Sequence, residues 1–443
     1  MKIQLSDHFT YQKLFKFTLP SVIMMIFTSV YGVVDGYFVS NYVGKTPFAA
    51  VNFIYPFIML LGAFGFMFGT GGSALIAKSL GQKQEEKANM QFSFIVYFSV
   101  ITGVVIAVLG IMFLRPIASL LGAEGELLKN SVLYGTIILA AMPFFMLQFE
   151  FQSFFVTAEK PKLGLYVTVI SGVTNMILDW LLIAVFSLGL AGAALATAVS
   201  QLVGGVIPLI YFGRKNTSLL KLEKTIFDLR TLIKCCTNGS SELMANFSMS
   251  LISMLYNAQL MKYAGEEGVA AYGVLMYVNM VFLAIFIGYS VGTAPVISYH
   301  FGAKNHSELK SLLKKSIVIM GSFSVVMFIS AEIFAKPLSL LFVGYDKGLM
   351  DITLNGFVIY SFSFLFAGFA IYGSSFFTAL NDGLTSAVIS FLRTLVFQVA
   401  AVLLLPLIWD IDGVWLSIVV AEAMAVIVNV FFLIVKKDKY KYW

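Results

Sequence analysis

The sequence predicts an all-α integral membrane protein, with twelve transmembrane helices in two pseudo-symmetric six-helix bundles. Composition is the first indication, because 59% of the 443 residues are hydrophobic, 12% are charged and mean hydropathy is +0.90. An average soluble domain has about 25% charged residues. The other two indications are twelve apolar runs long enough to cross a bilayer and a second half that repeats the first.

Each apolar run reaches the roughly 20 residues that a transmembrane helix requires. The first run follows a basic stretch, as in a signal peptide. It continues past Val33 without a small-residue cleavage site, so we interpret it as a membrane helix. The predicted spans are 15–40, 48–78, 91–114, 132–157, 163–186, 190–212, 233–262, 269–300, 315–335, 354–380, 384–407 and 413–435.

Lysine and arginine set the predicted orientation. With the N-terminus inside, most of the 29 Lys and Arg residues fall in the inner segments, and such a bias marks the cytoplasmic side. We therefore expect a multi-pass membrane protein with both termini in the cytoplasm. The net charge of +6 comes from loops that meet lipid headgroups, so it does not predict nucleic-acid binding.

An internal repeat divides the chain. Sliding the sequence by 221 residues aligns the two halves without a gap, which is typical of duplicated units. Six spans in each half predict lobes related by an axis along the membrane normal, with a ligand cavity between them. The predicted domains are an N-terminal lobe (1–212), a cytoplasmic linker (213–232) and a C-terminal lobe (233–443). Aligned pairs include Tyr42 with Tyr263, Gly71 with Gly292, Gly81 with Gly302, Lys83 with Lys304, and Pro116 with Pro337.

A carboxylate lies well inside the first span, at Asp35. An acid at a helix centre costs about 2.5–3.5 kcal/mol on insertion scales, and it normally faces a bundle interior and has a partner. The fifth span offers Asn175 and Asp179 at spacing i, i+4, on one helix face. Asp35, Asp179 and Thr197 each lie about eight residues from the outer end of their spans, near one plane about 12 Å inward.

Two carboxylates, an amide and a hydroxyl at one depth predict an all-oxygen site for a coupling ion. Na⁺ takes such hard ligands, and two adjacent buried carboxylates can equally share a proton. The alternative is that Asp35 and Asp179 only form hydrogen bonds within the bundle. The aligned positions of the second half argue for coupling, because none is charged: Tyr256, Val396, Ala400 and Ile418.

Other polar and methionine residues within the spans have less certain roles. Glu242 fits a helix cap and a cavity position equally well, and Glu422 aligns with Gln201 and is expected to pair with Arg393 as a structural contact. Gly65 and Gly69 predict close helix packing, and Pro20 predicts a bend in the first span. Candidate substrate-cavity residues are Tyr31, Met146, Gln148, Glu150, Met176, Glu242, Asn246 and Asn257.

These residues together resemble the multidrug and toxin extrusion (MATE) family, in its DinF-like, MepA-like bacterial branch. The resemblance covers essentially the whole chain. Its pieces are Leu19-Pro20, Asp35 before Gly44, Asn175-xxx-Asp179, Thr197, Gly292-Thr-Ala-Pro295 and Tyr299-His-Phe-Gly-Ala-Lys304. Each piece is moderately specific, and their order along two six-helix halves is highly specific.

The resemblance implies V-shaped lobes and alternating access, with inward H⁺ or Na⁺ driving export of bulky, often cationic, drug-like compounds. It implies that Asp35, Asn175, Asp179 and Thr197 form the ion site and that Pro20 is the bending position. Other branches place acids in the second lobe, where Glu242 lies in a sequence that departs from their motif. We expect membrane lipid as the surroundings, a monomer, and no cofactor beyond the coupling ion.

Two other functions fit the sequence less well. A lipid or oligosaccharide-lipid flippase needs several basic residues in its cavity for pyrophosphate, and only Arg393 lies in the interior of a span, away from the span ends. An enzyme needs a nucleophile–base constellation or a metal motif such as H-E-x-x-H, and the sequence has neither. The sequence therefore favours an ion-coupled exporter over both.

Overall fold

The computed structural model describes residues 3–344 and 346–443. Within these ranges every regular element is a helix, and none is a strand. The first half contains α1 (Tyr11–Phe38), η1 (Val39–Val43), α2 (Lys45–Gly81), α3 (Glu85–Leu120), α4 (Gly125–Ala140), α5 (Met142–Thr157), α6 (Pro161–Asp179), η2 (Trp180–Val185) and α7 (Gly189–Gly213). The elements written η are π-helical turns.

The second half begins with a helix of 74 residues, α8. Its elements are α8 (Leu229–Gly302), α9 (His306–Val343), α10 (Lys347–Ser361), α11 (Phe364–Ala379), α12 (Gly383–Phe391), the π-helical η3 (Leu392–Val396), α13 (Phe397–Leu404) and α14 (Pro406–Tyr440). A straight α8 would be roughly 110 Å long, several times the thickness of a bilayer. Gly265 divides it, with φ 61° and ψ −151°, a conformation that essentially only glycine adopts.

The described helices account for the twelve predicted spans. Nine are long and apolar enough to cross a membrane, and two bent pairs, α4 with α5 and α10 with α11, bring the number to eleven. The break at Gly265 makes two spans of α8, which gives twelve. The bends within the fourth and tenth spans, 57° and 49°, were not predicted. The predicted fold class is confirmed.

Local sequence explains where several helices begin. Prolines 143, 161 and 406 occupy the first turns of α5, α6 and α14, where a missing N–H costs nothing. Asp228 caps α8 by accepting the backbone N–H groups of Arg230 and Thr231. The Thr231 hydroxyl also donates to Asp228, and this hydrogen bond holds the pKa of that carboxyl below its usual value.

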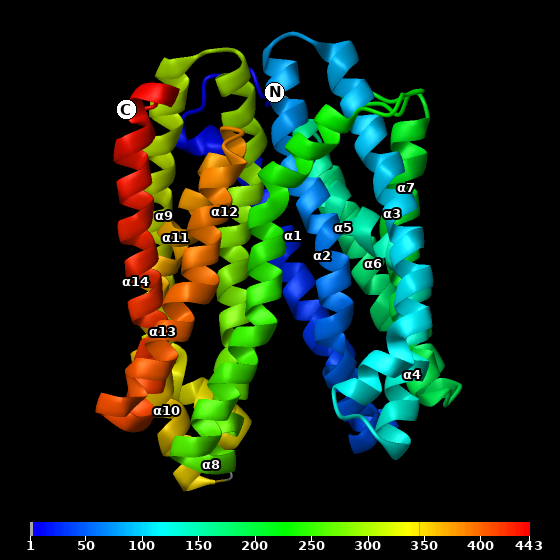
Figure 1. Ribbon diagram of the computed structural model, residues 1–443, viewed down its shortest axis with the longest axis vertical. Coiled ribbons are helices and arrows are strands. Elements are labelled where there is room, and N and C mark those ends of the chain that lie inside the picture. Colours follow the sequence, from blue (N-terminus) through cyan, green and yellow to red (C-terminus); the bar gives the residue numbers. More distant parts are fainter. Residues whose placement is uncertain (1–2, 345) are drawn as a thin grey trace.

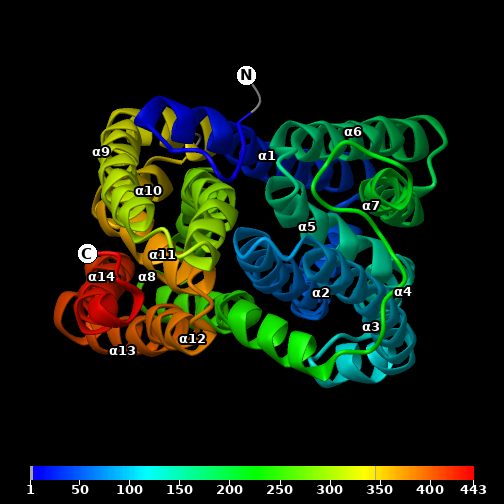
Figure 2. The same ribbon diagram turned by 90° about the horizontal axis from the view of Figure 1, so that it is seen from above.

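The helices form two groups that diverge toward one end of the molecule (Figure 1). Helices α1–α7 form one group and α8–α14 the other, with α1, α2 and α8 on the sides where the two groups meet (Figure 2). Both chain ends lie at the opposite end (Figure 1), which we call the terminal end. The exact lobe boundaries, 212 and 233, stay a prediction.

Glycines bring α2 and α8 into backbone contact across the two groups. A Cβ atom on Gly81 would lie 2.0 Å from Tyr299 O, and one on Gly302 would lie 2.1 Å from Lys78 O. These two glycines are 221 residues apart, so one contact repeats the other through the internal symmetry. Further from the terminal end, a Cβ on Gly71 would lie 2.1 Å from Cys235 O. Only glycine allows such an approach.

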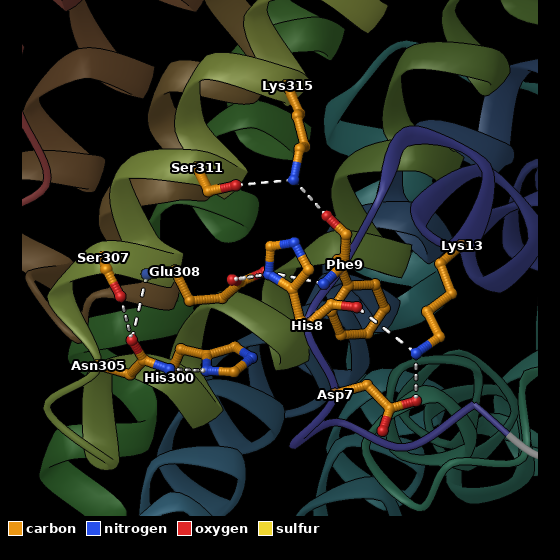
Figure 3. Close-up of polar contacts among 10 residues, drawn as sticks. All are labelled: Asp7, His8, Phe9, Lys13, His300, Asn305, Ser307, Glu308, Ser311 and Lys315. Carbon is orange, nitrogen blue, oxygen red and sulfur yellow. Dashed lines mark hydrogen bonds and ion pairs between the residues drawn. The ribbon is translucent and has the colours of Figure 1, made fainter.

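A strap formed by residues 5–10 also joins the two groups at the terminal end. The Leu5 N–H donates to Glu159 Oε1 at 2.7 Å, on the loop between α5 and α6. On the other side, the Phe9 N–H donates to Glu308 Oε1 at 2.9 Å, and His8 Nδ1 lies 2.6 Å from Glu308 Oε2 (Figure 3). Lys315 donates to the Phe9 carbonyl. Leu5 and Phe9 are fully buried, so the strap is part of the packed structure.

We predict that Gly302→Ala destabilises the closed terminal end. The added methyl group would overlap a backbone oxygen that cannot rotate away, and overpacking of this kind costs about 1–3 kcal/mol. Gly273→Ala, also within α8, is the matched control because a Cβ there meets nothing within 4 Å. Thermal unfolding in detergent should show a lower midpoint for Gly302→Ala only, and equal midpoints would contradict the prediction.

Candidate functional site

The polar cluster of the first half starts at Asp35 on α1. This half-buried residue lies one turn before η1, and its backbone carbonyl accepts the Val39 N–H. Asp179 is the last residue of α6 and is followed directly by η2. Single π-helical turns are frequent at functional sites because they reorient the side chains around them. Both acids therefore lie where the regular helix gives way.

The structure brings Asp35, Asn175, Asp179 and Thr197 together. Thr197 Oγ1, on α7, donates to Asp35 Oδ1 at 3.4 Å, and Asn175 Nδ2 donates to Thr197 Oγ1 at 3.4 Å. The carboxylates of Asp35 and Asp179 are neighbours within the same cluster. Residues from α1, α6 and α7 thus meet at one level, as the common depth predicts.

Several acceptors in this cluster have no donor. Both carboxylate oxygens of Asp179 and the amide oxygen of Asn175 are buried and lack a hydrogen-bond partner among the described residues. Buried polar atoms normally have a hydrogen-bond partner. An acceptor without one therefore indicates a place for a proton, a water molecule or an ion. An alkali cation or a shared proton fits oxygen donors of this kind. The residues present therefore suit the predicted coupling ion.

Two tyrosines near this cluster were missed by sequence reasoning. Tyr55 on α2 and Tyr134 on α4 are both close enough to Asp35 for a direct electrostatic interaction. Tyr134 is buried and also interacts with Thr197. With 20 tyrosines in the chain, a phenol in a span carries no signal of its own, and only the fold shows which of them surround the acids.

The predicted substrate-cavity residues of the first half fall into two groups. Met146, Gln148 and Glu150 on α5 are enclosed in this conformation. Gln148 donates to Ser171 Oγ at 3.3 Å, and the α5 backbone at Met146 and Glu150 packs against Gly65 and Gly69, as the glycine spacing predicts. Tyr31 and Met176 are half-buried instead. Contact of any of them with a substrate stays a prediction.

The second half has a different polar centre. Arg393 on η3 makes a bidentate ion pair with Glu422 on α14, at 2.9–3.1 Å, which confirms the predicted pairing. Glu242 lies near Arg393, and Asn246 Nδ2 donates to the Glu242 carbonyl at 2.8 Å. The capping role considered for Glu242 is wrong, because α8 begins at Leu229 with Asp228 as its cap. Asn257, further along α8, is half-buried.

Pro20 lies in the interior of α1, and its side chain is buried. Proline removes the hydrogen bond to the carbonyl four residues earlier and so weakens the helix at that point. The weak point lies fifteen residues before Asp35, toward the terminal end. A bend there would move the segment that carries the acid, and this role stays a prediction.

Two six-helix groups joined at one end, with a buried carboxylate pair inside one of them, define a polytopic membrane transporter. The family model MatE matches the chain twice, over residues 20–181 and 243–404, once in each half. The chain belongs to the MatE family, whose members are transporters and not enzymes. It is a multi-pass membrane protein.

Curated relatives span almost the whole chain. It is 27% identical over 444 residues to the multidrug export protein MepA of Staphylococcus haemolyticus (strain JCSC1435), covering 98% of this chain and 96% of the relative. It is 24% identical to MepA of Staphylococcus aureus (strain MRSA252), covering 97% and 94%.

Solved structures share the fold. The chain matches a crystal structure of MATE in complex with MaL6 with a TM-score of 0.93 at 21% identity, covering 98% of each chain. It matches an outward-facing multidrug resistance MATE family transporter of the MOP superfamily with a TM-score of 0.93 at 22% identity, covering 100% and 99%. A MOP superfamily transporter from Pyrococcus furiosus matches at 0.91 and 22%.

We predict that Glu422→Leu alone is strongly destabilising and that Arg393→Met restores stability in the double variant. Removing Glu422 leaves the largely buried Arg393 guanidinium without its ion-pair partner, and breaking such a pair costs about 3–5 kcal/mol. Replacing both residues removes the demand for a partner. Glu126→Leu, in the exposed pair with Lys129, is the control and should change little. Unfolding midpoints in detergent measure all three. A double variant no more stable than the single one would contradict a structural role for the pair.

Proposed function

We propose that this protein is a secondary active multidrug exporter that exchanges bulky, often cationic, organic compounds for inward H⁺ or Na⁺ by alternating access. The names of its MepA relatives support the substrate class. The Staphylococcus origin of these relatives supports a bacterial plasma membrane location. The distribution of Lys and Arg supports an orientation with the terminal end in the cytoplasm. The protein would act as a monomer in lipid.

One observation carries the proposal: the unsatisfied oxygens around Asp35 and Asp179. Two carboxylates that share a buried site repel each other unless a proton or a cation lies between them. The buried acceptors of Asp179 and Asn175 offer such a cation direct ligands. The aligned positions of the second half carry no acid, and the charged centre there is already neutralised by the Arg393–Glu422 pair.

Exchange then follows from differential affinity. A ligand shifts a conformational equilibrium only by as much as it prefers one state over the other. In this conformation the lobes touch at the terminal end through the glycine contacts and the strap. A cation at Asp35 and Asp179 would stabilise this state, and a drug entering from the cytoplasm would favour the state in which the terminal end is open.

A flippase for pyrophosphate-linked lipids fits less well. Such a substrate needs free cationic side chains in the cavity. Arg393 is the one basic residue in the interior of a predicted span, away from the span ends. Two of its guanidinium nitrogens are occupied by Glu422. The flippase is therefore the alternative function, and a transport assay with a lipid-linked pyrophosphate tests it.

We predict that Asp35→Asn abolishes ion-driven export. Purified protein in sealed vesicles is given a fluorescent organic cation, with a pH gradient or a Na⁺ gradient imposed separately. Asn keeps the size of the side chain but cannot carry the negative charge that binds the ion. Gradient-driven transport should therefore fall at least tenfold.

The control for Asp35→Asn is Asp438→Asn, an exposed carboxylate beyond the last predicted span, which should transport like the wild type. Full gradient-driven export by Asp35→Asn would remove the coupling role. Transport of a lipid-linked pyrophosphate in place of the organic cation would favour the flippase.

We predict that Glu308→Ala opens the terminal end more often, because the strap loses both contacts to Glu308. Cys235 is a built-in reporter. It is fully buried on α8 at the contact with α2, with its Sγ 3.6 Å from Phe68 O. In a Cys236→Ser background, a thiol reagent should label Cys235 several times faster in Glu308→Ala than without it.

The matched control for the strap is Glu126→Ala in the same background, since Glu126 lies on α4 and is exposed. It should leave the labelling rate unchanged. An unchanged rate in Glu308→Ala would mean that the strap does not hold the lobes together.

A further inference from the structure

The second half contains an apolar cavity that the proposed function does not use. It has a volume of about 260 Å³ and is enclosed by α9, α11 and α14, with Leu313, Tyr372, Phe376 and Leu433 among its lining residues. An apolar cavity of about 150 Å³ already binds benzene. Asn429 is the polar exception in the wall, and its Nδ2 is taken up by the Phe369 and Ala370 carbonyls of α11.

The cavity faces the membrane rather than the partner lobe. α9 and α14 lie on the outer side of their group, away from α2–α7, with α11 behind them (Figure 2). Two lining residues, Ile317 on α9 and Val430 on α14, are 38% and 48% exposed and mark the mouth. Leu313 and Ile317 lie roughly 10–17 Å along α9 from its start. This is the depth of acyl chains in the leaflet next to the terminal end.

The cavity and its mouth form a groove between α9 and α14, and the internal repeat gives the corresponding groove of the first half, which side chains fill. The aligned positions of Leu313, Tyr372, Phe376 and Leu433 in the first half are Phe92, Phe151, Phe155 and Phe212. These four rings pack together, with centroids 5.0 Å apart for Phe92 and Phe212 and 5.2 Å for Phe155 and Phe212. Two of the four aromatic rings are replaced by leucine in the second half, and the space they would occupy is left open.

The first-half groove is also covered by the chain itself. The linker crosses α3, where Asn89 Oδ1 accepts the Lys221 N–H at 2.9 Å and Ser93 Oγ accepts the Glu223 N–H at 2.8 Å. Leu220 is fully buried beneath this crossing. The positions aligned with Asn89 and Ser93 in α9 are Lys310 and Lys314. Where the first half binds a backbone, the second half therefore carries two exposed cations.

A third cation, Lys437, lies on α14, across the cavity from α9. On α14, Val426, Val430, Leu433 and Lys437 follow the spacing i, i+4, i+7, i+11 of one helix face. Lys437 therefore lies on the face that lines the cavity, one turn closer to the terminal end. The neighbouring Lys436 is paired with Asp382. Of the nearby acids, Glu308 is engaged by the strap, and Asp438 is exposed one residue beyond Lys437.

We propose that this groove binds an anionic phospholipid of the leaflet next to the terminal end. One acyl chain fills the cavity between α9, α11 and α14, and the phosphate lies among Lys310, Lys314 and Lys437. Basic pockets between transmembrane helices recognise anionic headgroups in this way, and lysine stems reach the headgroup level by snorkelling. The proposal does not depend on the coupling ion or on the exported compound.

Filling the cavity as the first half does is the direct test. The variant Leu313→Phe/Leu433→Phe restores two aromatic rings of the sister groove. Full-length protein is purified in detergent, titrated with phosphatidylglycerol, and its bound lipids are counted by native mass spectrometry. The first phosphatidylglycerol should bind at least fivefold more weakly than in the wild type. Leu195→Phe, an exposed leucine on α7, is the matched control and should bind as the wild type does.

The charge requirement is tested with Lys310→Gln/Lys314→Gln, which should weaken phosphatidylglycerol by a similar factor without changing phosphatidylcholine of the same chain length. Lys162→Gln, exposed at the start of α6, is its control. Equal affinity of the filled variant and the wild type would overturn the proposal, as would equal affinity for the two lipids.

A labelling experiment on the unsubstituted protein keeps the proposal testable if the filled variant does not fold. A phosphatidylglycerol with a photoreactive acyl chain is added, and the crosslinked peptides are identified. They should come from residues 313–317, 369–376 and 426–433. Even labelling of all lipid-facing helices would overturn the proposal.

Discussion

The contact between α2 and α8 is a contact of backbones, and the rest of the structure depends on it. Gly81 and Gly302 face carbonyl oxygens across it, and Gly71 faces the turn that contains Cys235. In lipid, helices gain nothing from burying apolar side chains against each other, so close packing supplies the association. Such a contact depends on the absence of a side chain at these glycines, so even one added methyl group would disturb it. The strap adds polar contacts that close the same end.

The two halves share one frame but differ in what they do with it. The first half places Asp35, Asn175, Asp179 and Thr197 together and leaves acceptors unsatisfied. The second half neutralises its own charges in the Arg393–Glu422 pair. In the first half the outer groove is filled by aromatic rings and covered by the linker, while in the second it stays open and is bordered by lysines. Duplication thus supplied two copies of a scaffold, and the differences between them indicate function.

Much of this was predictable, and for physical reasons. Membrane spans are visible because the bilayer demands long apolar runs, and the depth of Asp35, Asp179 and Thr197 follows from counting residues along helices. The Arg393–Glu422 pair was foreseen because buried charges need partners. The prediction that Glu242 caps a helix was wrong, because α8 begins 13 residues before it, at Leu229.

What the sequence did not reveal depends on long-range packing. Tyr55 and Tyr134 approach Asp35 from other helices, and no spacing along the chain marks them. No motif marks residues 5–10, yet Glu159 and Glu308, about 150 and 300 residues away, hold them in place. A cavity is likewise a property of side chains from three helices at once.

The central claim is that the ion site in one lobe controls the closure of the terminal end, which lies more than twenty residues away along α1. Labelling of Cys235 in a Cys236→Ser background, measured while Na⁺ concentration and pH are varied separately, tests it most directly. The account predicts slower labelling at high Na⁺, because the ion stabilises the closed state. It also predicts slower labelling at low pH once each rate is divided by the rate of a free thiol at the same pH, since the thiolate is the reacting form. Neither response should remain after Asp35→Asn. An equal response with and without Asp35→Asn would contradict it.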